Sequence, residues 1–133
     1  MRISLIALFL FATTLMADYS HQPIDQKLID SKIKIIDIRT PSEWKTTGLV
    51  KGSFPIMFFD ENGNYDMNGF LAQLNQKVKK NERFALICNS GSRSKVLGTY
   101  LGKQLEYSVI DLDGGIQYAI GKKIPLEPYK PKP

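Results

Sequence analysis

The chain has 133 residues, a length that suits one domain able to bury an apolar core without crosslinks. Its formal net charge is +5, but the lysines are scattered and lack interleaved aromatic residues, which argues against a nucleic-acid partner. A single cysteine, Cys88, excludes a disulfide bond within the chain.

The first seventeen residues, MRISLIALFLFATTLMA, have the layout of a secretory signal peptide. Arg2 gives a positive start, an apolar run extends from Ile3 to Phe11, and Ala17 is a small residue before Asp18. The run is short for a membrane-spanning helix, which needs about 20 residues, so a signal peptide is preferred to an uncleaved anchor or a buried core segment. We expect cleavage after Ala17, and a periplasmic or secreted protein without stable membrane insertion.

Residues 18–126 are predicted to form one domain in which strands alternate with helices. Apolar spacing predicts a helix within residues 23–32, a strand over residues 34–38, and a helix that starts with Thr40 as its cap and ends at Gly48. A short strand at residues 53–56 and a turn at residues 60–64 come next.

In the second half, a helix is predicted over residues 66–80, a strand over residues 84–87 and another helix after the loop that begins at Cys88. A strand over residues 107–112 leads through Gly114 and Gly115 into a last short helix. This alternation predicts an α/β fold with a mostly parallel sheet. The proline-rich end, residues 127–133, is expected to be a flexible tail.

The cysteine lies in the stretch ICNSGSRS, directly after the strand at residues 84–87. Ligands of open α/β sheets bind where such strands end and a helix begins. Gly91 and the small side chains of Asn89, Ser90 and Ser92 allow successive amide groups to turn inward as an anion cradle. The helix N-terminus would favour the thiolate form of Cys88, which predicts a nucleophile.

Arg93 follows in the same loop and offers a planar fork for an anionic substrate. Taken alone, the loop leaves open a buried structural cysteine, which lone cysteines in strands usually are. The combination of cysteine and arginine, separated by Asn, Ser and Gly, favours a reactive thiol over a structural one.

At these residues the sequence resembles the rhodanese family in its single-domain form. The resemblance rests on Cys88, Gly91, Arg93 and Ser94 in the loop, and on two further segments. These are IIDIRTPSEWKTTGLVKGSFPI at residues 35–56 and LDGGIQYAIGKKIPL at residues 112–126. The chain departs from the family at Leu49, Val50, Ala119 and Lys123, which are packing positions.

The resemblance implies a three-layer domain with a mostly parallel sheet of about five strands flanked by helices. It also implies sulfur transfer, in which Cys88 attacks thiosulfate or a similar small anionic donor and passes the sulfur to cyanide or a thiol. Arg93 would orient the donor, and amides from Asn89 to Ser94 would stabilise a Cys88 persulfide. Asp37 and Arg39 would be a structural pair that supports the loop, and no metal or organic cofactor is implied.

A sulfur carrier and a phosphatase are the alternative functions for this loop. A periplasmic sulfur carrier would load Cys88 in the same way but would release sulfur only to a partner protein. A phosphatase is disfavoured because the related phosphatases have five residues between cysteine and arginine, whereas four separate Cys88 from Arg93 here. The sequence carries no indication of oligomeric state.

No catalytic role is expected for five residues outside the loop. His21 is expected to be a solvated residue near the new terminus, and Trp44 a packing residue. Phe58, Phe59 and Tyr65 surround a turn, where they could line the site, although cover for the sheet edge is the favoured interpretation.

Overall fold

The computed structural model describes residues 17–133. The signal peptide predicted for residues 1–17 lies outside the described residues, apart from Ala17, and stays a prediction. Between residues 17 and 133, no helix is both long and apolar enough to cross a bilayer.

Five strands form the central sheet, in the order β1-β6-β5-β2-β4. Every ladder in it is parallel, so the carboxyl ends of the strands meet along one edge. This agrees with the predicted mostly parallel sheet. The strands are β1 Asp18–Pro23, β2 Lys34–Asp37, β4 Phe54–Pro55, β5 Phe84–Ile87 and β6 Ser108–Asp113.

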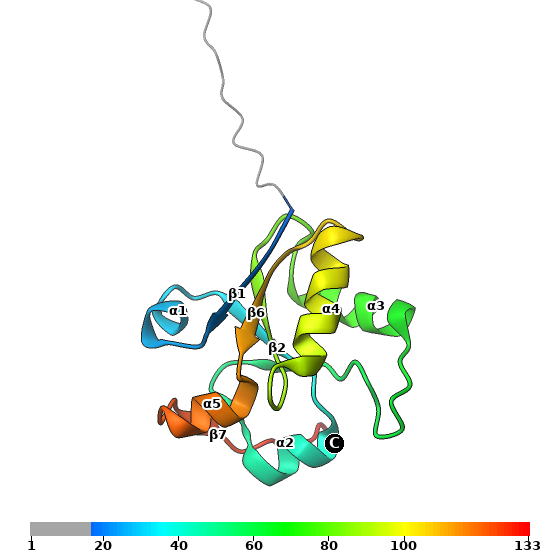
Figure 1. Ribbon diagram of the computed structural model, residues 1–133. Helices are drawn as coiled ribbons and strands as arrows, with labels where there is room; N and C mark the ends of the chain where they lie inside the picture. The colour runs from blue at the N-terminus through cyan, green and yellow to red at the C-terminus, as the bar shows by residue number, and fades with distance from the viewer. Residues whose placement is uncertain (1–16) are drawn as a thin grey trace, which may run out of the picture.

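Helices cover both faces of this sheet, as Figure 1 shows. The helices are α1 Gln26–Asp30, α2 Pro41–Thr47, α3 Met67–Lys77, α4 Ser92–Lys103 and α5 Gly115–Gly121. Successive strand residues point to opposite faces. Phe84 and Leu86 of β5 therefore pack with α3 and α4, while Ala85 and Ile87 pack with α1 and α5. The result is the expected three-layer domain, with β5 buried on both faces.

Helix α2 lies near the carboxyl edge of the sheet and is fixed at both ends by local hydrogen bonds. Thr40 and Glu43 form a capping box, because the Glu43 amide donates to Thr40 Oγ1 and the Thr40 amide donates to Glu43 Oε1. Pro41 occupies the first turn, and Gly48 ends the helix with a φ of 79°. This is the helix predicted from residues 40–48.

Asp37 and Arg39 form an ion pair whose side chains have no exposed surface. Arg39 Nε and Nη2 donate to the Asp37 carboxylate at 2.9 to 3.2 Å, and Nη2 also donates to the Gly48 carbonyl at 2.9 Å. The indole N–H of Trp44 donates to Asp37 Oδ1 at 3.1 Å. The pair therefore anchors α2 to the end of β2, and Trp44 is a buried packing residue as predicted.

Two strand pairings were not predicted. Residues 18–23 form β1, which pairs with β6 over six residues, and β3 Leu49–Val50 pairs antiparallel with β7 Leu126–Glu127. The expected tail from residue 127 thus begins within a strand, and Tyr129 packs against Trp44 with ring centroids 5.2 Å apart. Flexibility of the last residues stays a prediction.

Replacing Arg39 by Met should destabilise the fold by about 3–5 kcal/mol, because it leaves the buried Asp37 carboxylate without a counter-charge. Arg83→Met is the matched control, since Arg83 is exposed and donates to Ser20. It should cost no more than about 0.5 kcal/mol. Urea unfolding of both variants measures the difference, and equal losses would contradict the anchoring role of the pair.

Candidate functional site

The Cys88 side chain lies at the end of β5, and the loop that follows turns back onto its sulfur. Sγ accepts hydrogen bonds from the Gly91 amide at 3.1 Å and from the Ser94 amide at 3.4 Å. Gly91 permits this turn because its φ of 102° lies in the left-handed region. Ser92 then begins α4, so the sulfur also lies near a helix N-terminus. The predicted cradle is present, and within it these two amides contact the sulfur.

The start of α5 holds the other side of the loop. The Ile116 amide donates to the Cys88 carbonyl at 2.8 Å, and the Gln117 amide donates to the Asn89 carbonyl at 3.2 Å. Gly115 makes this approach possible, because a Cβ there would overlap both carbonyl oxygens. The Gln117 side chain also donates to Asn89 Oδ1 at 2.9 Å. The loop is therefore clamped between α4 and α5.

Behind the sulfur lies a buried polar chain. Ser94 Oγ is 3.4 Å from Cys88 Sγ and donates to Asp111 Oδ1 at 2.5 Å. The Tyr19 hydroxyl donates to Asp111 Oδ2 at 3.1 Å. Burial is the main cause that raises the pKa of Asp111, and burial together with the Asp111 charge raises the pKa of Tyr19. A hydrogen-bonded carboxyl group thus stands two contacts away from the thiol.

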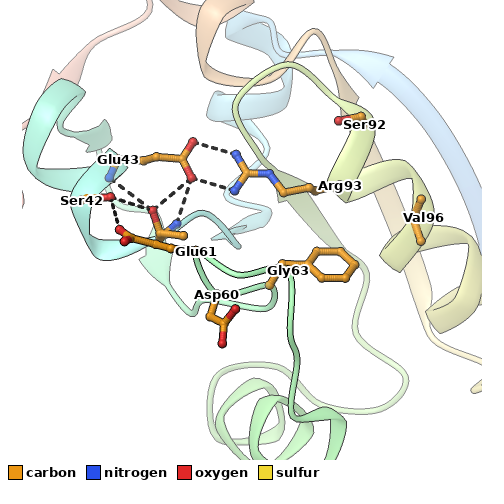
Figure 2. A pocket seen from close by; sticks show the side chains of 10 residues that line it. Ser42, Glu43, Asp60, Glu61, Gly63, Ser92, Arg93 and Val96 are labelled. Atoms are coloured by element: carbon orange, nitrogen blue, oxygen red, sulfur yellow. Dashed lines mark hydrogen bonds and ion pairs between the residues drawn. The ribbon is translucent and has the colours of Figure 1, made fainter.

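Arg93 points from α4 across to α2, where Glu43 meets it (Figure 2). Its two terminal nitrogens donate to the two carboxylate oxygens of Glu43, each at 2.7 Å. The hydrogen bond from Arg93 is the largest cause that lowers the pKa of Glu43, from its ordinary 4.5 to about 2. Glu43 in turn raises the pKa of Arg93. Both terminal nitrogens of the arginine predicted to bind an anion therefore already donate to a carboxylate of the same chain.

A hollow opens beside this ion pair, and α2, α4 and the segment between β4 and α3 line it. Phe59 is one of its walls, together with Ser42, Glu61 and Val96. Phe58 is buried against Phe59 and Tyr65, in agreement with the expected cover. Phe59 packs against the same core and also lines the hollow, so it takes both of the roles that the sequence left open.

The remaining predicted residues lie around the loop. Ser90 and Ser92 are exposed, while Asn89 is half-buried. His21 is exposed, as expected, but it belongs to β1, and its ring Nδ1 lies 2.9 Å from Asp113 Oδ2, which raises its pKa. Among residues 17–133, no three His, Cys, Asp or Glu side chains gather where they could hold a metal ion.

Sequence reasoning missed Glu43, Asp111 and Tyr19. Glu43 was assigned only to a helix cap, because nothing local indicates a partner fifty residues away. Asp111 carried a usable signal, since an acid inside the apolar strand at residues 107–112 is rare unless it is paired. Tyr19 lay before the first predicted element.

Gly115→Ala should disrupt the cradle, because the added Cβ would overlap the Cys88 and Asn89 carbonyl oxygens and the φ of 56° is strained for alanine. Gly121→Ala is the matched control in the same helix, with open space around its Cβ. We expect a loss of about 2 kcal/mol or more for Gly115→Ala, and a neutral or slightly stabilising effect for the control. Thermal unfolding measures both, and equal midpoints would contradict the clamp.

The Arg93 contact makes Glu43 a source of acid sensitivity. Its folded pKa of about 2 lies below its ordinary 4.5, so the stabilisation is fully present above pH 4.5 and is lost as the pH falls toward 2. Glu43→Gln keeps an oxygen for the Thr40 cap but cannot titrate. Unfolding free energies should therefore differ between wild type and variant at neutral pH, and the difference should shrink below pH 4.5 and vanish only as the pH falls to about 2. A constant difference would contradict the ion pair.

Comparison with known proteins gives the fold and the loop a context. The sequence model of the family described as Rhodanese-like domain matches residues 19–119. A rhodanese-like domain protein from Staphylococcus aureus has a similar structure, with 27% identity and a TM-score of 0.53 over 69% of this chain and 79% of that chain. Among curated proteins, none matches.

Two further structures share the fold. A rhodanese-related protein from Thermoplasma volcanium is 22% identical, with a TM-score of 0.55 over 80% of this chain and 97% of that chain. A Rhodopseudomonas palustris protein of unknown function, described as a possible tyrosine phosphatase, is 24% identical, with a TM-score of 0.51 over 76% of this chain and 75% of that chain. The match across residues 19–119 confirms the resemblance, and the chain belongs to the rhodanese-like domain family, a superfamily of the sulfurtransferase type.

Proposed function

We propose that this protein is a sulfurtransferase that carries a sulfane sulfur as a persulfide on Cys88. The observation that carries the proposal is the cradle, in which the amides of Gly91 and Ser94 donate to Cys88 Sγ at the N-terminus of α4. These donors stabilise negative charge on sulfur, whether it belongs to a thiolate or to a persulfide. Membership of the family supports the same chemistry.

The reaction has two halves. In the first, the Cys88 thiolate attacks the outer sulfur of a donor such as thiosulfate, a sulfur–sulfur bond forms, and the donor's own sulfur–sulfur bond breaks to release sulfite. In the second, cyanide or a thiolate takes the outer sulfur and the Cys88 thiolate returns. Both halves balance without an external oxidant or reductant, and the covalent intermediate predicts ping-pong kinetics.

The other loop residues have supporting roles in this proposal. Asn89, Ser90 and Ser92 shape the turn, and Arg93 is the cation that a donor's sulfonate would meet. Because each terminal nitrogen of Arg93 already donates to Glu43, a sulfonate that bound both nitrogens in the same end-on way would displace that carboxylate. Asp37 and Arg39 support the site through α2, which carries Glu43, since their side-chain contacts are with Trp44, Thr47 and Gly48.

A sulfur carrier is the second candidate, and one observation favours it. Cys88 has no exposed surface, so the loop or a neighbouring side chain must move before any molecule reaches the sulfur. A partner protein that binds beside the loop would supply that movement. An enzyme would release sulfur to cyanide and small thiols, and a carrier would keep it.

We further propose that the mature protein works in the periplasm or outside the cell, with small molecules as donor and acceptor. The support is the signal-like character of residues 1–17. No role with nucleic acid is proposed, because the basic residues are scattered.

The test uses residues 18–133, wild type and Cys88→Ser, with thiosulfate, methanethiosulfonate and benzenethiosulfonate as donors. Intact mass should show one added sulfur atom on wild type and none on the variant. Cyanide should then remove the sulfur as thiocyanate. The same protocol on protein secreted from a cell that expresses the full chain locates the cleavage site by the same mass measurement.

Three results divide the candidates. Loading that needs Cys88, followed by thiocyanate release over many turnovers, establishes the transferase. Loading that persists in the presence of cyanide and small thiols favours the carrier. An unchanged mass with all donors would reject both the transferase and the carrier, and would indicate a binding module with the same fold.

A further inference from the structure

The hollow beside Arg93 is acidic although the chain as a whole is basic. Four charged side chains line the hollow, and three of them are acids: Glu43, Asp60 and Glu61, against Arg93 alone. The Ser42 hydroxyl donates to the Glu61 carboxylate at 2.6 Å, which holds Glu61 near Glu43 (Figure 2). A small dianion that approaches Arg93 therefore enters a field of net negative charge, while the chain carries +5 overall.

The end of the Arg93 guanidinium that faces α2 is already engaged by Glu43. Each terminal nitrogen donates to a different oxygen of Glu43, which is the bidentate geometry that a sulfonate would otherwise take. The low pKa of Glu43, about 2, shows that this carboxylate stays charged at any ordinary pH. Glu43 thus competes with an anionic donor for the same two N–H groups.

A second, apolar hollow adjoins the acidic hollow beside Arg93 and shares Phe59 and Val96 with it. Its other walls include Tyr65 and Tyr100, and the exposed fractions of Tyr65, Val96 and Tyr100 are 60%, 63% and 43%. The hollow measures about 290 Å³, and an apolar cavity of about 150 Å³ already accommodates a benzene ring. A donor bound near Arg93 therefore has apolar surface within reach on the α4 side.

We propose that this site selects a sulfane-sulfur donor of low negative charge that carries an apolar group, and that Glu43 discriminates against small dianions such as thiosulfate. The inference rests on the proposed sulfur transfer and specifies the substrate class of that same site. Glu43 is the residue that sets the charge preference. The apolar hollow, which Tyr65 and Tyr100 line together with Phe59 and Val96, receives the apolar group.

The step keeps the chemistry of the cradle. The Cys88 thiolate attacks the outer sulfur of an organic thiosulfonate, the new sulfur–sulfur bond forms, and the bond between the outer sulfur and the sulfonyl sulfur breaks. The products are the Cys88 persulfide and a sulfinate that bears the organic group. One negative charge enters with the donor and one leaves with the sulfinate, so atoms and charge balance.

Three donors separate charge from apolar surface. Thiosulfate is a dianion, methanethiosulfonate is a monoanion with a methyl group, and benzenethiosulfonate is a monoanion with a phenyl ring. The measurement is the second-order rate constant for loading Cys88, followed by intact mass. For wild type we expect benzenethiosulfonate to load faster than methanethiosulfonate, and both to load faster than thiosulfate. Added salt should speed thiosulfate loading, because it screens the repulsion between the dianion and the acidic hollow.

Glu43→Gln should raise the thiosulfate rate roughly tenfold, because it frees Arg93 and removes one negative charge, while benzenethiosulfonate changes far less. Glu61→Gln is the matched control, since it removes the same charge from the same hollow without touching Arg93, and its effect should be smaller. Val96→Ser should lower the preference for phenyl over methyl roughly threefold. Unfolding midpoints check that each variant folds.

Several outcomes would overturn the inference. They are thiosulfate as the fastest donor of wild type, slower thiosulfate loading after Glu43→Gln, or equal gains from Glu43→Gln and Glu61→Gln. Slower loading after Glu43→Gln would make Glu43 a holder of Arg93 for the donor instead of its competitor. Absence of loading by all three donors is a different result, because it would reject the proposed sulfur transfer itself.

Discussion

The site depends on one constraint, which is that the chain must turn back onto the Cys88 sulfur within the few residues between β5 and α4. Gly91 meets it by adopting a positive φ, so that its own amide and that of Ser94 donate to Sγ. Gly115 meets it from the other side, because only a residue without Cβ lets the start of α5 bind the Cys88 carbonyl. The loop is thus an enclosed turn fixed by two helices, and the carboxyl edge of the parallel sheet brings those helices together.

Charged groups in the interior follow a single rule, since each is hydrogen-bonded to a partner that the fold supplies. Asp37 is neutralised by Arg39 and receives the Trp44 indole N–H, which ties α2 to β2. Asp111 receives Ser94 and Tyr19, which ties β6 to α4 and β1. Because an unpaired charge in these positions would cost several kcal/mol, the pairs fix the relative placement of the elements around Cys88. The site is therefore held by polar contacts as well as by the apolar core.

Local patterns in the sequence predicted the parts of the fold that local physics decides. The capping box at Thr40 and the apolar strand at residues 84–87 are read from neighbouring residues, and the structure contains both. Strand β1 has no such pattern, because its residues are polar, include a proline, and become a strand by pairing with β6. Contacts such as Arg93 with Glu43 join residues far apart in the chain, so periodicity and spacing carry no trace of them.

The same distinction separates the chemistry of the site from its selectivity. The chemistry proposed for Cys88 depends on backbone amides, which any sequence able to make the turn presents in the same way, and so a short motif predicts it. The selectivity proposed for the site depends on side chains that α2, α4 and the segment before α3 bring to one hollow, where Glu43 binds both terminal nitrogens of Arg93. An arginine in the motif indicates an anion site only while its hydrogen-bonding groups are free. In this chain the Glu43 carboxylate already binds both terminal nitrogens of Arg93, and the substrate therefore has to be inferred from all the side chains around that ion pair.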